Sequence, residues 1–542
     1  MSGYLPSDLK LWPPSHIMFV NGLRAAWIVV VIWYEVCTFD YVLDTCQWPD
    51  IHQPDTPNSR IARVLVVADP QIIDHRSYPT RGFLTKASGQ FFIDLNLRRS
   101  WHSTINRVKP HAVVFLGDLM DNGRATMSNS EYNAYAARFF DIFKLKDLAM
   151  PTFFLPGNHD LGLGEDVSFS LEAPTRFTSH FGPWNHKTTI GNHTVMFIDA
   201  VALVEEDVVR ADRGYSYDNW PAVAGGSVDF VKRYAAHEHA SPIVLFTHIP
   251  LARPHGTDCG PLRERGTIRQ GQGFGYQNTL SNEASQFLLH SLRPSLIFSG
   301  DDHDYCEYSH PLPFSSASGS TTVREITVKS FSMAMGIRRP GFQLLSLIST
   351  VPALETLTQL PNSPPSLLDT PCFLPDQLGI YLNVYLPFIL LSVLGLLAFN
   401  VHRTLAGGNK QAQRRPEVYP RPSHPEHSSS RANSDYELYR RSLGQTNTED
   451  TDEDPILPLP VTKLTGSAHS SKLRGRSSSS SHSWPFYFLG RRRRISLSLP
   501  CSSANRGVHE VGLLHGFFSD VVDVAWPPLL AFCVAAWCAT HV

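Results

Sequence analysis

The stretch PTFFLPGNHD, residues 151–160, decides the fold and predicts a site. An apolar, β-prone run ends at Leu155 and breaks at Pro156-Gly157. The break presents Asn158, His159 and Asp160 in a tight turn, directly after a short strand. A buried strand that ends in polar side chains is the usual way in which an α/β fold builds a site.

Four other short apolar runs end in the same way. The five runs, each with the polar residues that follow it, are Val64–Ala68 with Asp69 and Gln71, Ala112–Leu116 with Asp118 and Asp121, Thr152–Leu155 with Asn158 and His159, Ile243–Phe246 with His248, and Leu296–Phe298 with Asp301, Asp302, His303 and Asp304. The pattern predicts five strands whose carboxyl ends carry carboxylates, amides and imidazoles to one edge.

The polar residues at these ends form a candidate metal site. Its expected ligands are Asp69, Gln71, Asp118, Asn158, His248, Asp301 and His303, with His159 beside them. Oxygen and imidazole donors together suit Mn²⁺, Fe or Zn, and one carboxylate can bridge two ions. Any one of these residues alone is better explained as a turn cap or a satisfied histidine. Five in series, each at a strand-to-loop break, favour the metal site.

The remaining pattern predicts an α/β fold with mixed sheets. Helical stretches over 91–108, 130–145, 228–239 and 282–292 alternate with the strands, and 194–198 and 324–329 read as further strands. At 542 residues the chain is too long for one ordinary domain. A net charge of −2 gives no overall attraction to nucleic acid, so no nucleic-acid partner is expected.

The segments Gly117-Asp118-x-x-Asp121, Gly157-Asn158-His159-Asp160, the isolated His248 and Gly300-x-x-His303 resemble the calcineurin-like metallophosphoesterase superfamily. The match is closer to the membrane-bound branch that remodels GPI anchors by removing ethanolamine phosphate. The resemblance covers about residues 60–350 and implies a sandwich of mixed β-sheets flanked by helices. It also implies a phosphoric ester hydrolase, a phosphodiesterase in this branch, that uses two divalent ions.

The resemblance assigns roles to the site residues. Asp118 bridges the ions, Asp69, Gln71 and His303 complete one metal site, and Asn158, His248 and Asp301 complete the other. His159 is the general acid, oriented by Asp160, and Asp121 supports the site. Gln71 and Asp301 stand where the superfamily carries histidine, and these oxygen donors favour Mn²⁺. Which of Asp301, Asp302 and Asp304 turns inward is left open, with Asp301 preferred.

Hydrophobic stretches on both sides of this region predict a multi-pass membrane protein. The expected segments are a cytosolic N-terminus (1–16), a transmembrane helix (17–38), a linker (39–60), the phosphoesterase domain (61–350), a luminal linker (351–377), a transmembrane helix (378–400), a disordered cytosolic Ser/Pro/Arg-rich tail (401–520) and a third span (521–540). A cleaved signal peptide is the alternative for the first span, although no small-x-small site follows it.

Charge asymmetry predicts that the catalytic domain lies in the lumen of the endoplasmic reticulum or Golgi. Lys10 and Arg24 precede the first span, whereas acidic residues follow it. The sequon at Asn192 agrees with a luminal domain, and so does the position of four cysteines, Cys46, Cys259, Cys306 and Cys372, where bridges persist.

The expected substrate is a GPI-anchored protein or GPI glycolipid, and the tail is a candidate binding segment for cytosolic sorting factors. Two alternatives stay open. One is a metallophosphoesterase that acts on nucleotides, lipids or phosphoproteins. The other is a non-catalytic, metal-binding scaffold that sorts cargo, which the intact Asn158-His159-Asp160 segment disfavours.

Overall fold

The computed structural model describes residues 15–52, 59–164, 166–237, 241–312, 321–350, 366–412, 482–488, 491–497 and 513–541. The chain divides into two compact units, Met1–His402 with Leu513–Val542, and Arg403–Gly512. In the second unit, β14 (His482–Phe488) and β15 (Arg491–Leu497) form an antiparallel hairpin. The prediction of a wholly disordered tail is therefore wrong for these strands, and residues 413–481 lie outside the described ranges.

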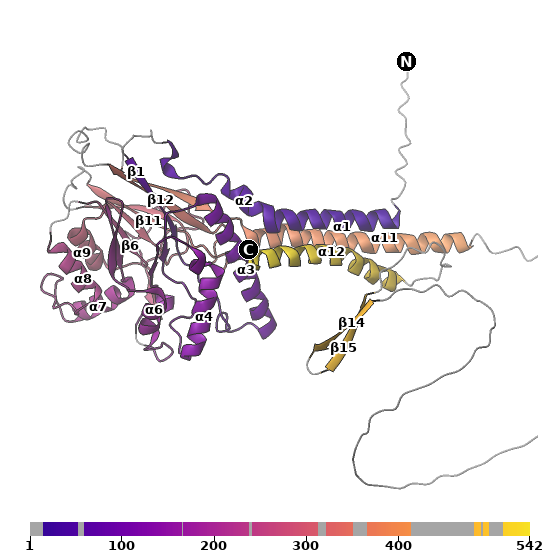
Figure 1. The fold of residues 1–542 in the computed structure, drawn as a ribbon, viewed down its shortest axis with the longest axis horizontal. Coiled ribbons are helices and arrows are strands. Elements are labelled where there is room, and N and C mark those ends of the chain that lie inside the picture. The colour runs from indigo at the N-terminus through magenta and orange to yellow at the C-terminus, as the bar shows by residue number, and fades with distance from the viewer. Residues whose placement is uncertain are drawn as a thin grey trace, which may run out of the picture. The chain divides into compact units, whose positions relative to one another are not determined.

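Two mixed β-sheets form the centre of the first unit, as the sequence predicts (Figure 1). Their strand orders are β13-β12-β1-β2-β3 and β10-β11-β9-β6-β5-β4. The first sheet contains β1 (Ser59–Val67), β2 (Ala112–Leu116), β3 (Thr152–Leu155), β12 (Gly341–Thr350) and β13 (Leu367–Phe373). The second contains β4 (His186–Ile190), β5 (His193–Ile198), β6 (Ile243–Thr247), β9 (Leu296–Ser299), β10 (Cys306–Pro311) and β11 (Thr322–Thr327). Strands β1, β2 and β3 run parallel, and so do β5, β6, β9 and β11.

Helices cover the outer faces of both sheets. On the first sheet lie α3 (Phe83–Val108) and α4 (Asn129–Ile142), and on the second lie α7 (Ala200–Asp212), α8 (Ser227–Ala235) and α9 (Asn282–Leu292). Shorter elements are α5 (Asn158–Leu161), α6 (Ala173–Phe181), and the hairpin of β7 (Gln272–Gly273) with β8 (Tyr276–Gln277).

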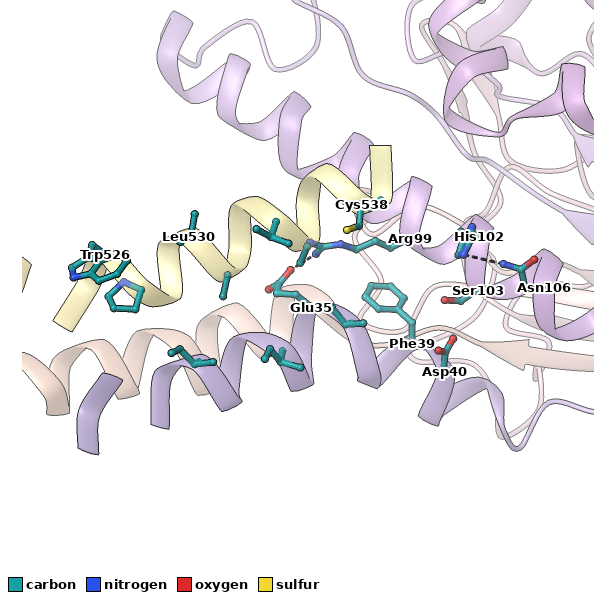
Figure 2. A pocket seen from close by; sticks show the side chains of 18 residues that line it. Glu35, Phe39, Asp40, Arg99, His102, Ser103, Asn106, Trp526, Leu530 and Cys538 are labelled. Carbon is teal, nitrogen blue, oxygen red and sulfur yellow. Dashed lines mark hydrogen bonds and ion pairs between the residues drawn. The ribbon is translucent and has the colours of Figure 1, made fainter. Parts of the chain in front are cut away.

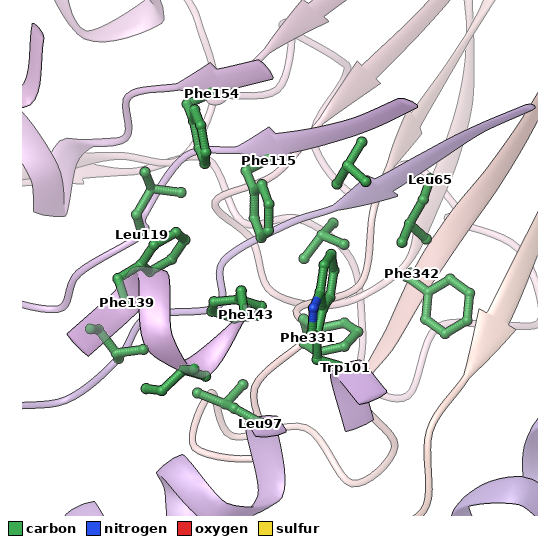
Figure 3. Close-up of a cluster of buried hydrophobic side chains, with 14 of the residues drawn as sticks. Leu65, Leu97, Trp101, Phe115, Leu119, Phe139, Phe143, Phe154, Phe331 and Phe342 are labelled. Carbon is green, nitrogen blue, oxygen red and sulfur yellow. The ribbon is translucent and has the colours of Figure 1, made fainter. Parts of the chain in front are cut away.

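Alternation along the strands sorts their side chains into separate cores. Val64 and Val66 of β1 face the core between the sheets, whereas Leu65 and Val67 face the core under α3 and α4. That second core is aromatic, with Phe115 in contact with Phe139 and other rings (Figure 3). Each fully buried side chain of this size contributes about 1.5–3 kcal/mol. The packing on both faces fixes where each strand ends.

Among the residues that the structure describes, three helical segments are long and apolar enough to cross a membrane. The first, His16–Leu43, consists of α1 (His16–Ile32), a π-helical turn (Trp33–Cys37) and α2 (Thr38–Leu43). The second, Gln377–Ala406, consists of α10 (Gln377–Ile380), another π-helical turn (Tyr381–Tyr385) and most of α11 (Leu386–Ala412). The third is the whole of α12 (Leu513–His541). His16 Nε2 lies 2.8 Å from Asp520 Oδ1, and Arg24 lies 3.2 Å from Asp523. These pairs between α1 and α12 compensate the two acidic residues of the third segment.

The opposite ends of these helices contact the sandwich. Glu35, near the end of the first segment, is buried and paired with Arg99 of α3 (Figure 2). A disulfide between Cys46 and Cys372 joins the chain after α2 to the last strand before α10. The first helical segment and the sandwich are therefore linked by an ion pair and by a disulfide.

The sandwich extends further than the predicted domain boundaries. Strand β1 begins at Ser59, and β13 continues the first sheet to Phe373, inside the segment expected to be a linker. Pro371 is tolerated there because β13 is an edge strand. Helix α3 also begins at Phe83 rather than near residue 91.

Candidate active site

The five predicted strand ends meet at one edge of the sandwich, because β1, β2 and β3 run parallel in one sheet and β6 and β9 run parallel in the other. Five of the expected ligands adopt the left-handed backbone conformation, with φ of 46° at Asp69, 37° at Gln71, 49° at Asp118, 66° at Asp301 and 67° at His303. Such a backbone is uncommon outside glycine and concentrates at functional sites.

Two glycines allow these turns to approach each other. A Cβ on Gly117, which has φ of 86°, would meet the His248 ring and lie 2.9 Å from the Gly157 nitrogen. A Cβ on Gly157 would lie 2.6 Å from His248 Nε2. The turn that carries Asp118 therefore lies against His248, with no room for a side chain at either glycine.

Four oxygen atoms lie close to the two nitrogens of the His248 imidazole. Its Nδ1 lies 2.6 Å from the Leu116 carbonyl oxygen and donates to it, so Nε2 is the nitrogen that faces the cluster. Nε2 lies 3.2 Å from Asn158 Oδ1, 3.3 Å from Asp118 Oδ1 and 3.6 Å from Asp301 Oδ1. The Asn158 amide donates from Nδ2 to the Gly275 carbonyl at 2.8 Å, so its oxygen faces the cluster.

The second expected group of ligands surrounds Asp69. Its Oδ1 accepts from the Asp301 N–H at 3.1 Å, whereas its buried Oδ2 has no hydrogen-bond partner among the described residues. Ligand atoms of Asp69, Asp118 and His248 all lie within 4.8 Å of one another. The Gln71 amide donates from Nε2 to Asp118 Oδ2 at 2.8 Å, so as a ligand Gln71 would have to present its oxygen instead.

The charges of the cluster fit divalent cations. Burial raises the pKa of Asp69 well above its usual range, and the charges of Asp118 and Asp301 add to the effect. Burial would also raise the pKa of Asp118, but the imidazoles of His248 and His159 hold it below its usual range. Burial lowers the pKa of His303, which keeps its imidazole neutral. Clustered carboxylates, an orphaned carboxylate oxygen and the neutral imidazole of His303 are a donor set that cations stabilise.

The sequence that builds this cluster is similar to a known family of proteins. Residues 62–305 match the family model for calcineurin-like phosphoesterases. Residues 62–305 are therefore similar to that family. The chain is 35% identical over 334 residues to Cell division control protein 1 of Saccharomyces cerevisiae, covering 61% of this chain and 64% of that protein. It is 27% identical over 356 residues to Metallophosphoesterase 1 of Ailuropoda melanoleuca, covering 61% and 81%.

Among solved structures, a purple acid phosphatase from yellow lupin seeds aligns with a TM-score of 0.35 and 13% identity, over 60% of this chain and 56% of that one.

Within the phosphoesterase domain, the segment 301–304 directs only one aspartate to the cluster. The Asp301 carboxylate faces His248. Asp302 pairs instead with Arg263, and Asp304 accepts from the backbone N–H groups of Glu264 and Arg265 at 2.8 and 3.2 Å. The arrangement agrees with the preference for Asp301 as the ligand, an assignment that stays a prediction.

His159 lies at the partly exposed rim of the cluster of expected ligands. Its backbone N–H donates to Asp118 Oδ1 at 2.9 Å, and its Nδ1 lies 2.7 Å from the Asp121 carbonyl oxygen and 3.5 Å from Oδ1 of the Asp121 carboxylate. The side chain is 27% exposed. The contact with Asp121 therefore occupies Nδ1 of the imidazole.

The prediction that Asp160 orients His159 is wrong in this structure. The buried Asp160 carboxylate instead accepts from the backbone N–H groups of Gly157 at 2.9 Å and of Leu119 and Met120 at 3.1 Å. It thereby ties the turn after β2 to the turn after β3. Burial raises the pKa of Asp160 to about 7, the charge of Asp118 adds to this, and the three N–H donors oppose it.

Sequence reasoning missed the groups that hold the Asn158 amide. The Arg124 guanidinium donates to the carbonyls of Asn158 at 3.1 Å and Gly275 at 2.9 Å. Gly275 ends the loop 258–275, and the Cys259–Cys306 disulfide joins this loop to the start of β10. Arg124 follows Asp118 and Asp121 at a spacing of three, but that signal alone does not distinguish it from a surface cation.

Proposed function

We propose that the chain is a two-metal phosphodiesterase that removes ethanolamine phosphate from the mannose of GPI anchors in the lumen of the endoplasmic reticulum or Golgi. One observation carries the reaction class. Asp69, Asp118 and His248 come from three different strand ends and bring their ligand atoms within 4.8 Å of one another in the domain interior. Burying two carboxylates side by side costs free energy unless a cation compensates their charge, so stability of the fold alone does not explain this cluster.

The residues of the chain divide the chemistry among them. Asp69, Gln71, Asp118 and His303 would hold one ion, and Asp118, Asn158, His248 and Asp301 the other. Two divalent ions, Mn²⁺ foremost, would supply positive charge that activates a water and binds the phosphate oxygens. His159 provides the proton for the leaving alcohol through Nε2, because Asp121 holds its Nδ1.

The substrate assignment rests on the resemblance to the GPI-remodelling branch and on the membrane helices. Candidate spans precede and follow the sandwich, and they hold the catalytic domain beside the membrane in which GPI glycolipids reside. Such anchoring fits a substrate that resides in the membrane.

The luminal location is supported by the cysteines and by the sequon. All four cysteines expected to be luminal are paired, as Cys46–Cys372 and Cys259–Cys306. Asn192 is exposed at the β4–β5 turn, where a glycan has space. Glycosidase treatment should shift the mobility of the wild-type chain but leave Asn192→Gln unchanged.

The test is mass spectrometry of GPI glycans from cells that lack the protein. Loss should leave an additional ethanolamine phosphate on a mannose, and the wild type should restore the normal glycan. Asp301→Asn should fail to restore it, whereas Asp302→Asn, which changes the adjacent carboxylate that faces Arg263, should succeed. Unchanged glycans, with turnover of a generic diester by the purified chain, would favour another phosphate ester as substrate. Absence of both activities would favour the scaffold.

A further inference from the structure

A cavity of about 780 Å³ lies between α1, α2, α3 and α12, away from the cluster of metal-ligand candidates (Figure 2). One part of its wall is apolar and comes from helices long enough to cross a membrane, with Ile32, Leu530 and Val534 among its residues. The other part is polar and includes Asp40, Arg99 and His102. An apolar section that continues into a polar one matches the boundary between lipid chains and headgroups.

Arg99 gives the cavity unused hydrogen-bond donors. The residue is only 7% exposed, and its Nη1 pairs with Glu35. Its Nε and Nη2 are buried and have no hydrogen-bond partner among the described residues, and the ring of Phe532 lies 5.6 Å from the guanidinium carbon. Buried guanidinium donors are normally satisfied, so an acceptor from outside the chain is expected at this position.

Glu35 does not supply that acceptor. Its Oε1 already accepts from the Tyr385 hydroxyl at 2.9 Å and from Gln377 Nε2 at 3.4 Å, and its Oε2 accepts from Arg99 Nη1. Glu35 and Tyr385 both lie on π-helical turns, a deviation that is frequent at functional sites. The ion pair therefore holds Arg99 in place while leaving its other edge available.

We propose that this cavity binds one zwitterionic glycerophospholipid. An acyl chain lies against α12 and α1, and the phosphate or an ester oxygen accepts from Nε and Nη2 of Arg99. The amine of the headgroup lies at Asp40, which is exposed and has no ion pair among the described residues. Glu35 neutralises Arg99, so Asp40 leaves the polar part with a net negative charge, which disfavours an anionic lipid.

The first test compares two substitutions to tryptophan on α12. The full chain is purified in detergent, and its retained lipids are measured by native mass spectrometry. Wild type should retain one phosphatidylethanolamine or phosphatidylcholine. Ala531→Trp fills the cavity and should lose this lipid, whereas Cys533→Trp, at an exposed position that does not line the cavity, should keep it. Equal retention by the two variants, or no retained lipid in wild type, would overturn the proposal.

The second test addresses the headgroup. The double change Glu35→Gln with Arg99→Met removes both charges together, so no charge is left unpaired, and it keeps an acceptor for Tyr385. The double variant should lose the lipid. Asp40→Lys should exchange the retained zwitterionic lipid for phosphatidylglycerol when both are offered in mixed vesicles. A wild type that selects phosphatidylglycerol, or an Asp40→Lys variant with unchanged selection, would contradict the assignment even where Ala531→Trp does not fold.

Discussion

Replacing Asp160 by alanine should unfold the site rather than slow the chemistry. The carboxylate is fully buried and accepts from three backbone N–H groups, those of Leu119, Met120 and Gly157. A buried N–H left without a partner costs about 1–3 kcal/mol, so three of them should lower the free energy of unfolding by at least about 3 kcal/mol. Metal binding and turnover should fall together with stability, because both turns carry ligands.

His159→Ala provides the contrast. Its imidazole is at the rim, and among the described residues it contacts only the carbonyl and the carboxylate of Asp121, so the free energy of unfolding should change by no more than about 1 kcal/mol. Turnover should fall by about 10²–10⁴-fold, the usual contribution of a proton donor, with metal content unchanged.

The assay combines denaturant unfolding, metal analysis and turnover of a generic phosphodiester on the same purified variants. Asp218→Ala, which removes an exposed acid in the loop after α7, serves as the control for surface effects. If Asp160→Ala keeps its stability within about 1 kcal/mol and its metals, yet loses turnover as His159→Ala does, then Asp160 orients His159 and the structural interpretation fails.

Three further outcomes are expected. After its metals are removed, the enzyme should recover most turnover with Mn²⁺. The double change Gln71→His with Asp301→His should shift this preference toward Zn²⁺, because the affinity of imidazole nitrogen rises most along the Irving–Williams order. Turnover after reconstitution with each metal tests this. Burial alone would raise the pKa of Glu325, but Arg253 and His310 outweigh burial and lower this pKa to about 2. Because this folded pKa is below the ordinary 4.5, its stabilisation is complete above pH 4.5 and is lost between 4.5 and 2. At about 1.4 kcal/mol per pKa unit, Glu325→Gln should remove about 3 kcal/mol of acid-dependent stability, measured by unfolding against pH. Replacing Cys259 and Cys306 by serine opens a loop of 47 residues and should cost up to about 4 kcal/mol, read from unfolding under non-reducing conditions; an unchanged midpoint would show that the bridge does not form.

Local pattern was sufficient to predict the strands that carry the site. Each is a short apolar run that ends at a polar turn, and strands of this kind need no knowledge of their partners. The added strands β12 and β13 were not predicted, because β12 gains its place only by pairing antiparallel with β1, nearly the whole domain away in sequence. The role of Asp160 was missed for the same reason, since two of its N–H partners lie some forty residues upstream, at 119 and 120.

The backbone strain of the site is a property that residue types alone do not reveal. Asp69, Gln71, Asp118, Asp301 and His303 all have positive φ, and conformations of this kind cost about 1–3 kcal/mol each outside glycine. Glycine would relieve that cost at every one of these positions, yet the sequence places side chains with oxygen or nitrogen donors there. Lys109, Lys144 and Arg293 have the same conformation at helix ends, so positive φ alone does not identify a ligand. Five of the nine non-glycine residues with positive φ in the described part of the chain are nevertheless expected ligands, and this concentration agrees with the metal-site interpretation.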